Sequence, residues 1–265
     1  MKTHTLCFRD NTICYKTSGQ GRAVFLLHGF LGKAELFTTL QTQLASSYRV
    51  IAPDLPGHGE SASYGYVHSM ELMAEVIHAI ARAHNLRRYV LVGHSMGGYV
   101  ALSYFNRYPQ CVAGIFLLNS TSKADSDIKK IERSRALEAL NANKTIFTSQ
   151  TLHALFAPGW PEAHPNVFTS VLQAAQCMKT PAIAAALRGM KDRHSGFDWI
   201  TRCEIPLGYG IGKLDRTLAP EELTAQCNSL KRGFAYYFNT TAHYSYLEAP
   251  VEVHRALRNF LRKCF

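Results

Sequence analysis

Residues 89–98 read YVLVGHSMGG, and this stretch decides the fold of the chain. Tyr89–Val92 is apolar on both faces, as a buried strand of a parallel sheet must be, and residues 99–108 form a helical pattern that Pro109 ends. The serine between strand and helix lies on a sharp turn, where glycines two positions before and after it avoid Cβ clashes. Such a turn lifts the Ser95 hydroxyl above the sheet edge. We therefore interpret Ser95 as a nucleophile.

Short apolar runs alternate with helix-like stretches on both sides of this turn. The runs are Phe25–Leu27, Val50–Ala52, Val90–Val92 and Ile115–Leu118. Their alternation with helical patterns indicates βαβ units, in which helices cover both faces of the sheet. Strand signals return at Ile205–Ile211 and Phe234–Phe238, before an amphipathic closing helix. Near the N-terminus, two β-prone runs around Asp10-Asn11 are typical of a hairpin. The predicted fold class is α/β, with a mostly parallel central β-sheet flanked by helices.

The alternation of strand and helix patterns stops after residue 120. Residues 121–200 carry only helical patterns, interrupted by prolines. An all-helical insert inside an α/β frame is typical of a lid. We therefore predict a core built from residues 1–120 and 201–265 and a helical cap over residues 121–200.

The serine needs two partners. A serine hydroxyl is a poor nucleophile at neutral pH, so a histidine must accept its proton and a carboxylate must orient that histidine. In such sheets the carboxylate precedes the histidine along the chain, and both follow strands at their carboxyl ends. Asp215 lies just after the strand ending at Ile211, and His243 follows the strand ending near Phe238. We predict Asp215 as the acid and His243 as the base.

Other residues compete for these two roles. His194, at the far end of the insert, is the main rival as base. Asp192 and Asp198 lie inside the insert. Glu221 and Glu222 begin a predicted helix, where acidic side chains stabilise the N-terminus. These positions favour Asp215 and His243 over their rivals.

A second glycine-flanked turn predicts where negative charge develops during the reaction. Residues 25–32, FLLHGFLG, run from a buried strand into a turn whose amides can point at a reacting carbonyl oxygen. The oxyanion donors that we predict are the backbone amides of Phe30 and Met96, the latter because it follows the nucleophile. His28 in this turn and His58 in another glycine-rich turn are interpreted as residues that hold loops. None of this chemistry requires a metal or an organic cofactor.

The composition bounds the class of protein. The chain has 265 residues, 47% of them hydrophobic, so a substantial core can form. No apolar run approaches the roughly 18 to 20 residues that span a bilayer, and residues 1–10 contain no apolar signal-peptide core. We expect a cytoplasmic protein that does not engage a membrane. The seven cysteines are scattered and lack metal-ligand spacing, which predicts free thiols and no metal site.

The formal net charge of +10 raises the question of an anionic partner. Basic residues cluster only in pairs such as Arg87-Arg88, and no nucleic-acid-binding motif lies beside them. We interpret the charge as a diffuse basic surface and expect no nucleic-acid partner. An acidic carrier protein is the alternative partner that this surface would suit.

The ordered motifs of the chain resemble those of the α/β-hydrolase superfamily over nearly its whole length. They are His28-Gly29-Phe30, Asp54–Ser61, Gly93–Gly98, Gly212–Asp215 and His243–Pro250. The resemblance implies a helical cap between the sixth and seventh strands. In layout the chain is similar to small capped serine carboxylesterases, including those that hydrolyse pimeloyl-carrier-protein methyl ester. We therefore expect hydrolysis of carboxylic esters with small to medium acyl groups through an acyl-enzyme intermediate.

Several alternatives stay open on the same fold. They are a thioesterase, a carrier-protein methyl esterase, a lyase like that of menaquinone biosynthesis and a slow-turnover ligand receptor. The turn around Phe30 looks like that of the lyase, which has an arginine directly after its Ser-Met-Gly-Gly. This chain has Tyr99 at that position. Tyr99 removes an obvious partner for an anionic substrate, which favours ester hydrolysis.

Large apolar side chains mark a candidate substrate pocket. Those that we select are Leu31, beside the anion-binding turn, and Phe156, Trp160 and Met190 in the insert, where Leu152 and Leu155 are further candidates. At helical spacing, core packing is the commoner explanation for any one of them.

Overall fold

The computed structural model describes residues 1–265 and contains one eight-stranded sheet. Its strands are β1 (Lys2–Phe8), β2 (Asn11–Ser18), β3 (Ala23–Leu27), β4 (Arg49–Pro53), β5 (Tyr89–His94), β6 (Val112–Leu118), β7 (Leu207–Gly212) and β8 (Gly233–Phe238). They lie in the order β1-β2-β4-β3-β5-β6-β7-β8, and only the pairs β1–β2 and β2–β4 are antiparallel. The mostly parallel sheet confirms the predicted α/β class.

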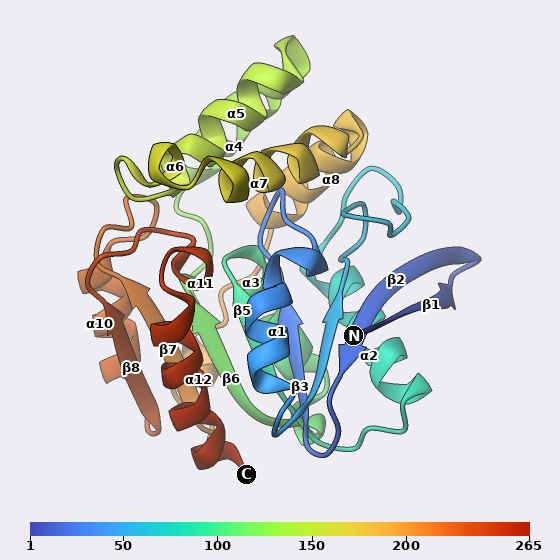
Figure 1. The fold of residues 1–265 in the computed structure, drawn as a ribbon, viewed down its shortest axis with the longest axis vertical. Coiled ribbons are helices and arrows are strands. Elements are labelled where there is room, and N and C mark those ends of the chain that lie inside the picture. Colours follow the sequence, from blue (N-terminus) through green and yellow to red (C-terminus); the bar gives the residue numbers. More distant parts are fainter.

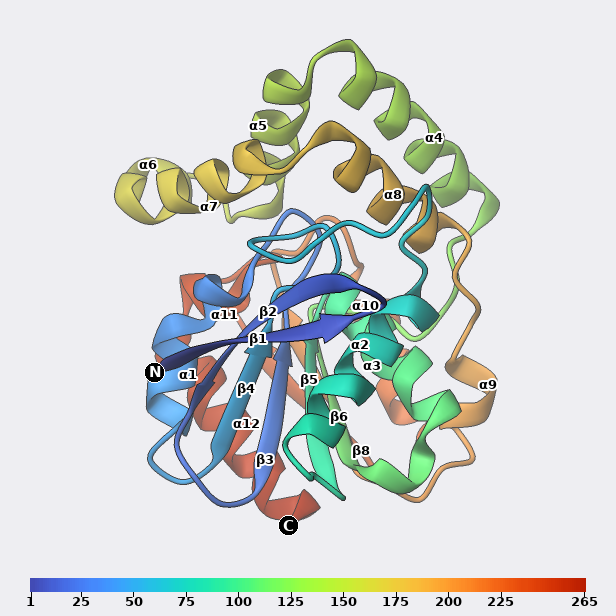
Figure 2. The ribbon, with the colours of Figure 1, turned by 90° about the vertical axis from the view of Figure 1, so that its right-hand side faces the viewer.

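Helices cover both faces of this sheet, as Figure 1 and Figure 2 show. They are α1 (Thr38–Leu44), α2 (Met70–Ala83), α3 (Met96–Arg107), α4 (Asp127–Ala142), α5 (Lys144–Leu155), α6 (Trp160–Ala163), α7 (Pro165–Cys177), α8 (Thr180–Lys191), α9 (Phe197–Ile200), α10 (Pro220–Asn228), α11 (Ser245–Glu248) and α12 (Pro250–Cys264), with short 3-10 turns η1 (Ala34–Phe37) and η2 (Pro109–Cys111). Helices α1 and α12 lie on one face, and α2 and α3 lie on the other. Strands β3, β5, β6 and β7 are buried along their whole length because both of their faces are covered. None of the helices combines the length and the apolar composition that crossing a membrane requires.

The N-terminal hairpin is present, but its turn lies one residue earlier than the sequence suggested. Phe8 pairs with Asn11, so the two turn residues are Arg9 and Asp10, with φ of 48° and 61°. Positive φ at both central positions gives a two-residue turn whose twist matches that of the flanking strands. Asn11 instead begins β2, and its side-chain amide donates to the Arg9 carbonyl oxygen. The predicted turn at Asp10-Asn11 is corrected accordingly.

The chain between β6 and β7 forms the helices α4 to α9 and no strand, so a helical cap follows the sixth strand as predicted. Figure 1 and Figure 2 show α4 to α8 above the sheet edge where the parallel strands end. Helix α9 lies apart from them, beside α3, where the Trp199 and Phe105 rings pack with centroids 5.3 Å apart. The bounds 121–200 for a separate domain stay a prediction.

Helix α8 attaches the cap to the core. The backbone N–H of His68, in the loop before α2, donates to the Ala185 carbonyl oxygen at 3.0 Å. Arg188 donates to the Tyr66 carbonyl oxygen, and its guanidinium lies 3.5 Å from the centre of the Tyr66 ring. A Cβ at Gly189 would lie only 1.8 Å from the His68 carbonyl oxygen. Glycine at this position therefore allows the cap helix and the core loop to pack backbone against backbone.

We expect Gly189→Ala to lower the free energy of unfolding by about 1–3 kcal/mol, because the added methyl group collides with the His68 carbonyl oxygen. In an unobstructed helix the same change raises stability by about 1 kcal/mol. Urea denaturation of the two proteins measures the sign of the effect. A more stable variant would show that α8 does not approach this loop closely.

Candidate active site

Ser95 lies between β5 and α3 with a strained backbone, at φ 50° and ψ −116°. Two glycines make room for the turn. A Cβ at Gly93 would lie 2.3 Å from the Gly97 carbonyl oxygen, and one at Gly97 would lie 2.1 Å from the Leu27 carbonyl oxygen. Such backbone geometry at a non-glycine residue costs about 1–3 kcal/mol and persists only where close packing imposes it. The packing here holds Ser95 at the carboxyl edge of the sheet.

His28 fixes the turn that follows β3. The Leu55 N–H donates to His28 Nε2 at 2.9 Å, so Nε2 carries no proton and Nδ1–H donates to the Gly29 carbonyl oxygen, 2.8 Å away. Burial lowers the pKa of His28, which keeps the ring neutral. A Cβ at Gly29 would lie 3.2 Å from the Cβ of Ser95, so this turn passes directly beside the serine. His28 therefore holds the loop, in agreement with its interpretation from the sequence.

The two predicted donor amides belong to the elements that meet at Ser95. Met96 is the first residue of α3, so its N–H has no acceptor within the helix. Met96 follows Ser95 directly and is completely buried. Phe30 follows Gly29 in the turn beside Ser95 and lines the same cavity as the serine. Both residues thus occupy positions from which an oxyanion donor can act.

His243 and Asp215 meet after the carboxyl ends of β8 and β7. His243 Nδ1 lies 2.7 Å from Asp215 Oδ2, and both side chains are almost completely buried. The other carboxylate oxygen accepts from the backbone N–H groups of Thr217 and Leu218. Burial by itself would raise the pKa of Asp215, but the charge and hydrogen bonding of His243 outweigh it and hold this pKa below its ordinary value. Asp215 is therefore ionised at neutral pH and oriented toward the imidazole.

Asn119 is a further member of this group that the sequence reasoning missed. It follows β6 with φ 45°, and its Nδ2 donates both to Asp215 Oδ2 at 3.2 Å and to the Ala242 carbonyl oxygen at 2.9 Å. Asn119 therefore ties the acid to the loop that carries the histidine. Its position directly after a buried strand, at the sheet edge shared by the other candidates, was the signal in the sequence.

His94 supports the same histidine loop from the nucleophile turn. A carbonyl oxygen only accepts, so His94 Nε2 carries the proton that it donates to the His243 carbonyl oxygen, 2.8 Å away. Burial, followed by repulsion from His243, lowers the pKa of His94 to about 3. The ring is therefore neutral and acts as a hydrogen-bonding support between the two loops.

Glu248 joins the histidine loop to the cap. Its carboxylate accepts from the backbone N–H groups of Ala242 at 2.9 Å and Tyr244 at 3.1 Å, and from that of Ala157 in the cap at 3.2 Å. Burial raises the pKa of Glu248 even though these three donors favour its charged form. The loop that carries the candidate base is thus held by the cap as well as by the core.

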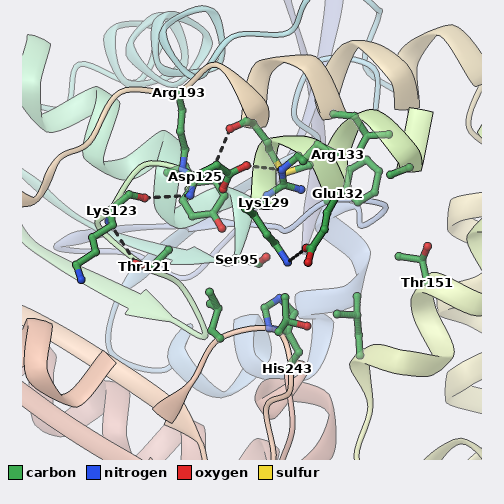
Figure 3. Close-up of a pocket in the computed structure, with 18 of the residues that line it drawn as sticks. Ser95, Thr121, Lys123, Asp125, Lys129, Glu132, Arg133, Thr151, Arg193 and His243 are labelled. Carbon is green, nitrogen blue, oxygen red and sulfur yellow. Dashed lines mark hydrogen bonds and ion pairs between the residues drawn. The ribbon is translucent and has the colours of Figure 1, made fainter. Parts of the chain in front are cut away.

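A cavity of about 560 Å³ lies where the strand ends meet the cap (Figure 3). Ser95 and His243 line it on the core side. Met190, one of the predicted pocket residues, lines it from the cap, together with Leu155 at the end of α5. The backbone N–H of His243 donates to the Leu155 carbonyl oxygen at 3.0 Å, so the cap contacts the candidate base directly.

The other three predicted pocket residues lie elsewhere. Leu31 is completely buried in the core. Phe156 stacks on both Tyr244 and Trp160, with ring centroids 4.7 Å apart in each pair. None of the three lines the cavity. The prediction that Leu31, Phe156 and Trp160 contact substrate is therefore corrected, because packing in the core and between the cap and the histidine loop accounts for them.

A covered, mostly parallel sheet with a serine turn at its carboxyl edge and a histidine–aspartate pair on later loops defines an α/β-type hydrolase. A family model described as the alpha/beta hydrolase fold matches residues 22–174, more than half of the chain. The chain belongs to the α/β-hydrolase fold family. Membership supports the predicted class, a hydrolytic enzyme.

Individual relatives share this layout to different extents. A pimeloyl-[acyl-carrier protein] methyl ester esterase of Sodalis glossinidius is 30% identical over 266 residues, covering 94% of this chain and 97% of that protein. Other curated relatives match only in part: an uncharacterised protein of Mycobacterium tuberculosis is 31% identical over 106 residues, and the match spans 31% of its length. Among solved structures, a malate-bound esterase from Thermogutta terrifontis has a TM-score of 0.93 and 27% identity, covering 100% of this chain and 99% of that one. An enol-lactonase from Burkholderia xenovorans, at 15% identity, a TM-score of 0.90 and coverage of 98% and 100%, shares the fold.

We expect Glu248→Gln to lower the free energy of unfolding by about 1–3 kcal/mol, because the amide cannot accept from all three backbone N–H groups. The exposed Glu138→Gln, inside α4, is the matched control and leaves stability unchanged. Urea denaturation measures both changes, and hydrogen exchange at Ala242 and Tyr244 locates the effect. Equal behaviour of the two variants would contradict a link through Glu248.

Proposed function

We propose that this protein is a serine esterase that hydrolyses carboxylic esters through an acyl-enzyme intermediate. The observation that carries the proposal is one cavity bordered by Ser95 on its strained turn and by His243, whose other ring nitrogen is held by Asp215. Membership of the α/β-hydrolase family and the esterases among its relatives support the same reaction class.

In the first step of the proposed reaction, Ser95 Oγ forms a bond to the ester carbonyl carbon and its proton passes to His243 Nε2. The carbonyl oxygen becomes an oxyanion, which the amides of Phe30 and Met96 stabilise. The intermediate then collapses. The bond to the alcohol oxygen breaks, and the alcohol leaves with the proton from His243, so that an acyl-Ser95 ester remains.

In the second step, a water molecule attacks the acyl-serine. His243 accepts a proton from this water and later returns it to Ser95 Oγ, which releases the carboxylic acid. Asp215 keeps Nδ1–H directed toward itself, so that Nε2 is free to accept, and its negative charge stabilises the imidazolium. The lowered pKa of Asp215 ensures that this charge is present at neutral pH.

Small to medium acyl groups suit the proposed site. The cavity of about 560 Å³ lies within the range of small-molecule pockets, roughly 300–1,000 Å³. Helices α4 to α8 lie above the sheet edge that carries Ser95, an arrangement that suits a compact substrate better than a polymer. The substrates that we favour are therefore small esters.

Esters attached to a carrier protein are the second candidate. The relative from Sodalis glossinidius is a pimeloyl-[acyl-carrier protein] methyl ester esterase that matches along 97% of its length. The net charge of +10 would attract an acidic partner. If this candidate holds, hydrolysis of a carrier-bound ester decreases as salt rises, whereas hydrolysis of a free neutral ester does not.

We expect the wild-type protein to hydrolyse short p-nitrophenyl esters and to react covalently with a fluorophosphonate at Ser95. Ser95→Ala should abolish both, because the hydroxyl that forms the acyl-enzyme is absent. Intact-protein mass spectrometry detects the adduct, and Ser103→Ala, on α3, is the control that retains labelling. A wild-type protein that stays unlabelled would overturn the proposal and leave a ligand receptor as the alternative.

We expect Asp215→Asn to reduce kcat by up to about 10⁴-fold while the protein stays folded, because the amide no longer stabilises the imidazolium or selects its tautomer. Steady-state kinetics with a p-nitrophenyl ester measure the loss, and circular dichroism checks the fold. The control is Asp198→Asn, in α9, which should retain the wild-type rate. A similar rate for Asp215→Asn and the wild type would show that Asp215 does not serve His243.

A further inference from the structure

The cavity is lined by an uneven set of charges, most of them on the cap side. Four cationic side chains line the cavity against three anionic ones. The cations are Lys123, Lys129, Arg133 and Arg193, and the anions are Asp125, Glu132 and Glu222. The wall therefore has a surplus of one positive charge, and the ion pairs among these residues show where the surplus lies.

Asp125 is shared by two guanidinium groups (Figure 3). Its Oδ2 accepts from Arg133 Nε at 2.7 Å, and its Oδ1 accepts from Arg193 Nη1 at 2.5 Å. The Asp125 side chain is only 3% exposed, so water does little to screen this cluster. One carboxylate balances only one of the two arginines.

Arg193 is occupied as a structural support. Beyond Asp125, its Nη1 donates to the Met190 carbonyl oxygen and its Nη2 donates to the Lys123 carbonyl oxygen. Its guanidinium lies 3.8 Å from the centre of the Tyr99 ring, at cation–π distance. Tyr99, which by sequence removes an obvious partner for an anionic substrate, instead contacts this arginine from the far end of the insert.

Arg133 keeps donors that the protein does not use. Its Nε bonds to Asp125, whereas neither terminal amino group has a protein acceptor. The side chain is 14% exposed and lines the cavity on the wall across from Ser95 and His243. The side chain that carries the unused N–H groups therefore lines the space that a substrate would fill.

The two lysines do not supply the surplus charge. Lys129 Nζ pairs with Glu132 at 2.8 Å, and Lys123 Nζ pairs with Glu222 at 3.1 Å. Both pairs are about half exposed, so water screens them. Arg133 and Arg193 thus share one carboxylate, and Arg133 is the one of the two whose terminal N–H groups have no protein acceptor.

We propose that Arg133 forms a carboxylate-binding subsite, so that the preferred substrates are esters that carry a free carboxylate apart from the reacting ester group. This inference rests on the proposed esterase function. The planar fork of a guanidinium matches the two oxygens of a carboxylate through parallel N–H···O bonds.

Desolvation is the physical reason for this preference. A neutral acyl group that filled the cavity would displace water from Arg133 without supplying an acceptor, which is costly for a charged donor. A carboxylate supplies both the charge and the acceptors. A single surplus charge suits a monoanion better than a dianionic phosphate, and the carboxylate of Glu132 on the same wall repels additional negative charge.

The test compares esters that differ only in the remote group. For a carboxylate on the acyl side, monomethyl esters of succinate, glutarate and adipate are compared with the corresponding dimethyl esters. For a carboxylate on the alcohol side, O-acetyl glycolate is compared with its methyl ester. The wild type should favour the carboxylate in at least one of the two series by about 10- to 100-fold in kcat/KM, the range expected of a charged hydrogen-bonded pair.

Arg133→Met should remove this preference, because kcat/KM falls for the carboxylate esters while neutral esters no longer displace water from the guanidinium. The remaining Asp125–Arg193 pair is balanced in charge. Arg133→Lys should restore part of the preference, because lysine keeps the charge but not the fork. Arg135→Met, an exposed position on the same helix, is the matched control and should behave as the wild type.

The possible results separate the two proposals. A wild type that cleaves neutral esters as well as carboxylate esters in both series overturns the subsite and leaves the esterase function standing. A preference that survives Arg133→Met also overturns the subsite. A wild type that cleaves no ester and is not labelled by a fluorophosphonate contradicts the esterase function itself.

Discussion

The close contact between the first turn of α3 and the end of β3 is the constraint on which the rest of the site depends. A Cβ at Gly97 would lie 2.1 Å from the Leu27 carbonyl oxygen, so the two backbones can approach only because this residue is glycine. The contact brings the turn at Gly29 against Ser95 and holds the serine at φ 50°. The cost of that backbone geometry, about 1–3 kcal/mol, is offset by the packing of buried parallel strands on either side.

Burial divides the histidines near the serine into supports and a candidate base. His28 and His94 are enclosed, their pKa values are lowered by burial, and each uses one ring N–H to hold a backbone carbonyl oxygen. His243 differs because its Nδ1 faces the ionised Asp215 while the residue also lines the cavity. A carboxylate partner together with access to the cavity is what makes one of several neighbouring histidines suitable for accepting a proton.

The cap takes part in the site in two physically different ways. The Ala157 N–H, which donates to Glu248, and the Leu155 carbonyl oxygen hold the loop of His243. The position of the candidate base therefore depends on the contact between cap and core. Through Arg133 and Arg193 the cap places charge on the wall across from the serine. The candidate reacting residues thus lie at the strand ends, whereas the helical insert supplies much of the opposite wall of the cavity.

The sequence by itself determined the α/β class and the candidates Ser95, Asp215 and His243, because each follows a buried strand and the carboxyl ends of parallel strands meet at one edge. Asn119 had the same local signal, but its role depends on a contact with residues far along the chain. Only the tertiary structure decided which cap side chains face the cavity. Leu155 and Phe156 are adjacent apolar residues at the end of α5, yet only Leu155 lines the cavity. The tertiary structure alone also paired Asp125 with Arg193, 68 positions away, because the balance of charge in a cavity depends on distances in space and not on spacing along the chain.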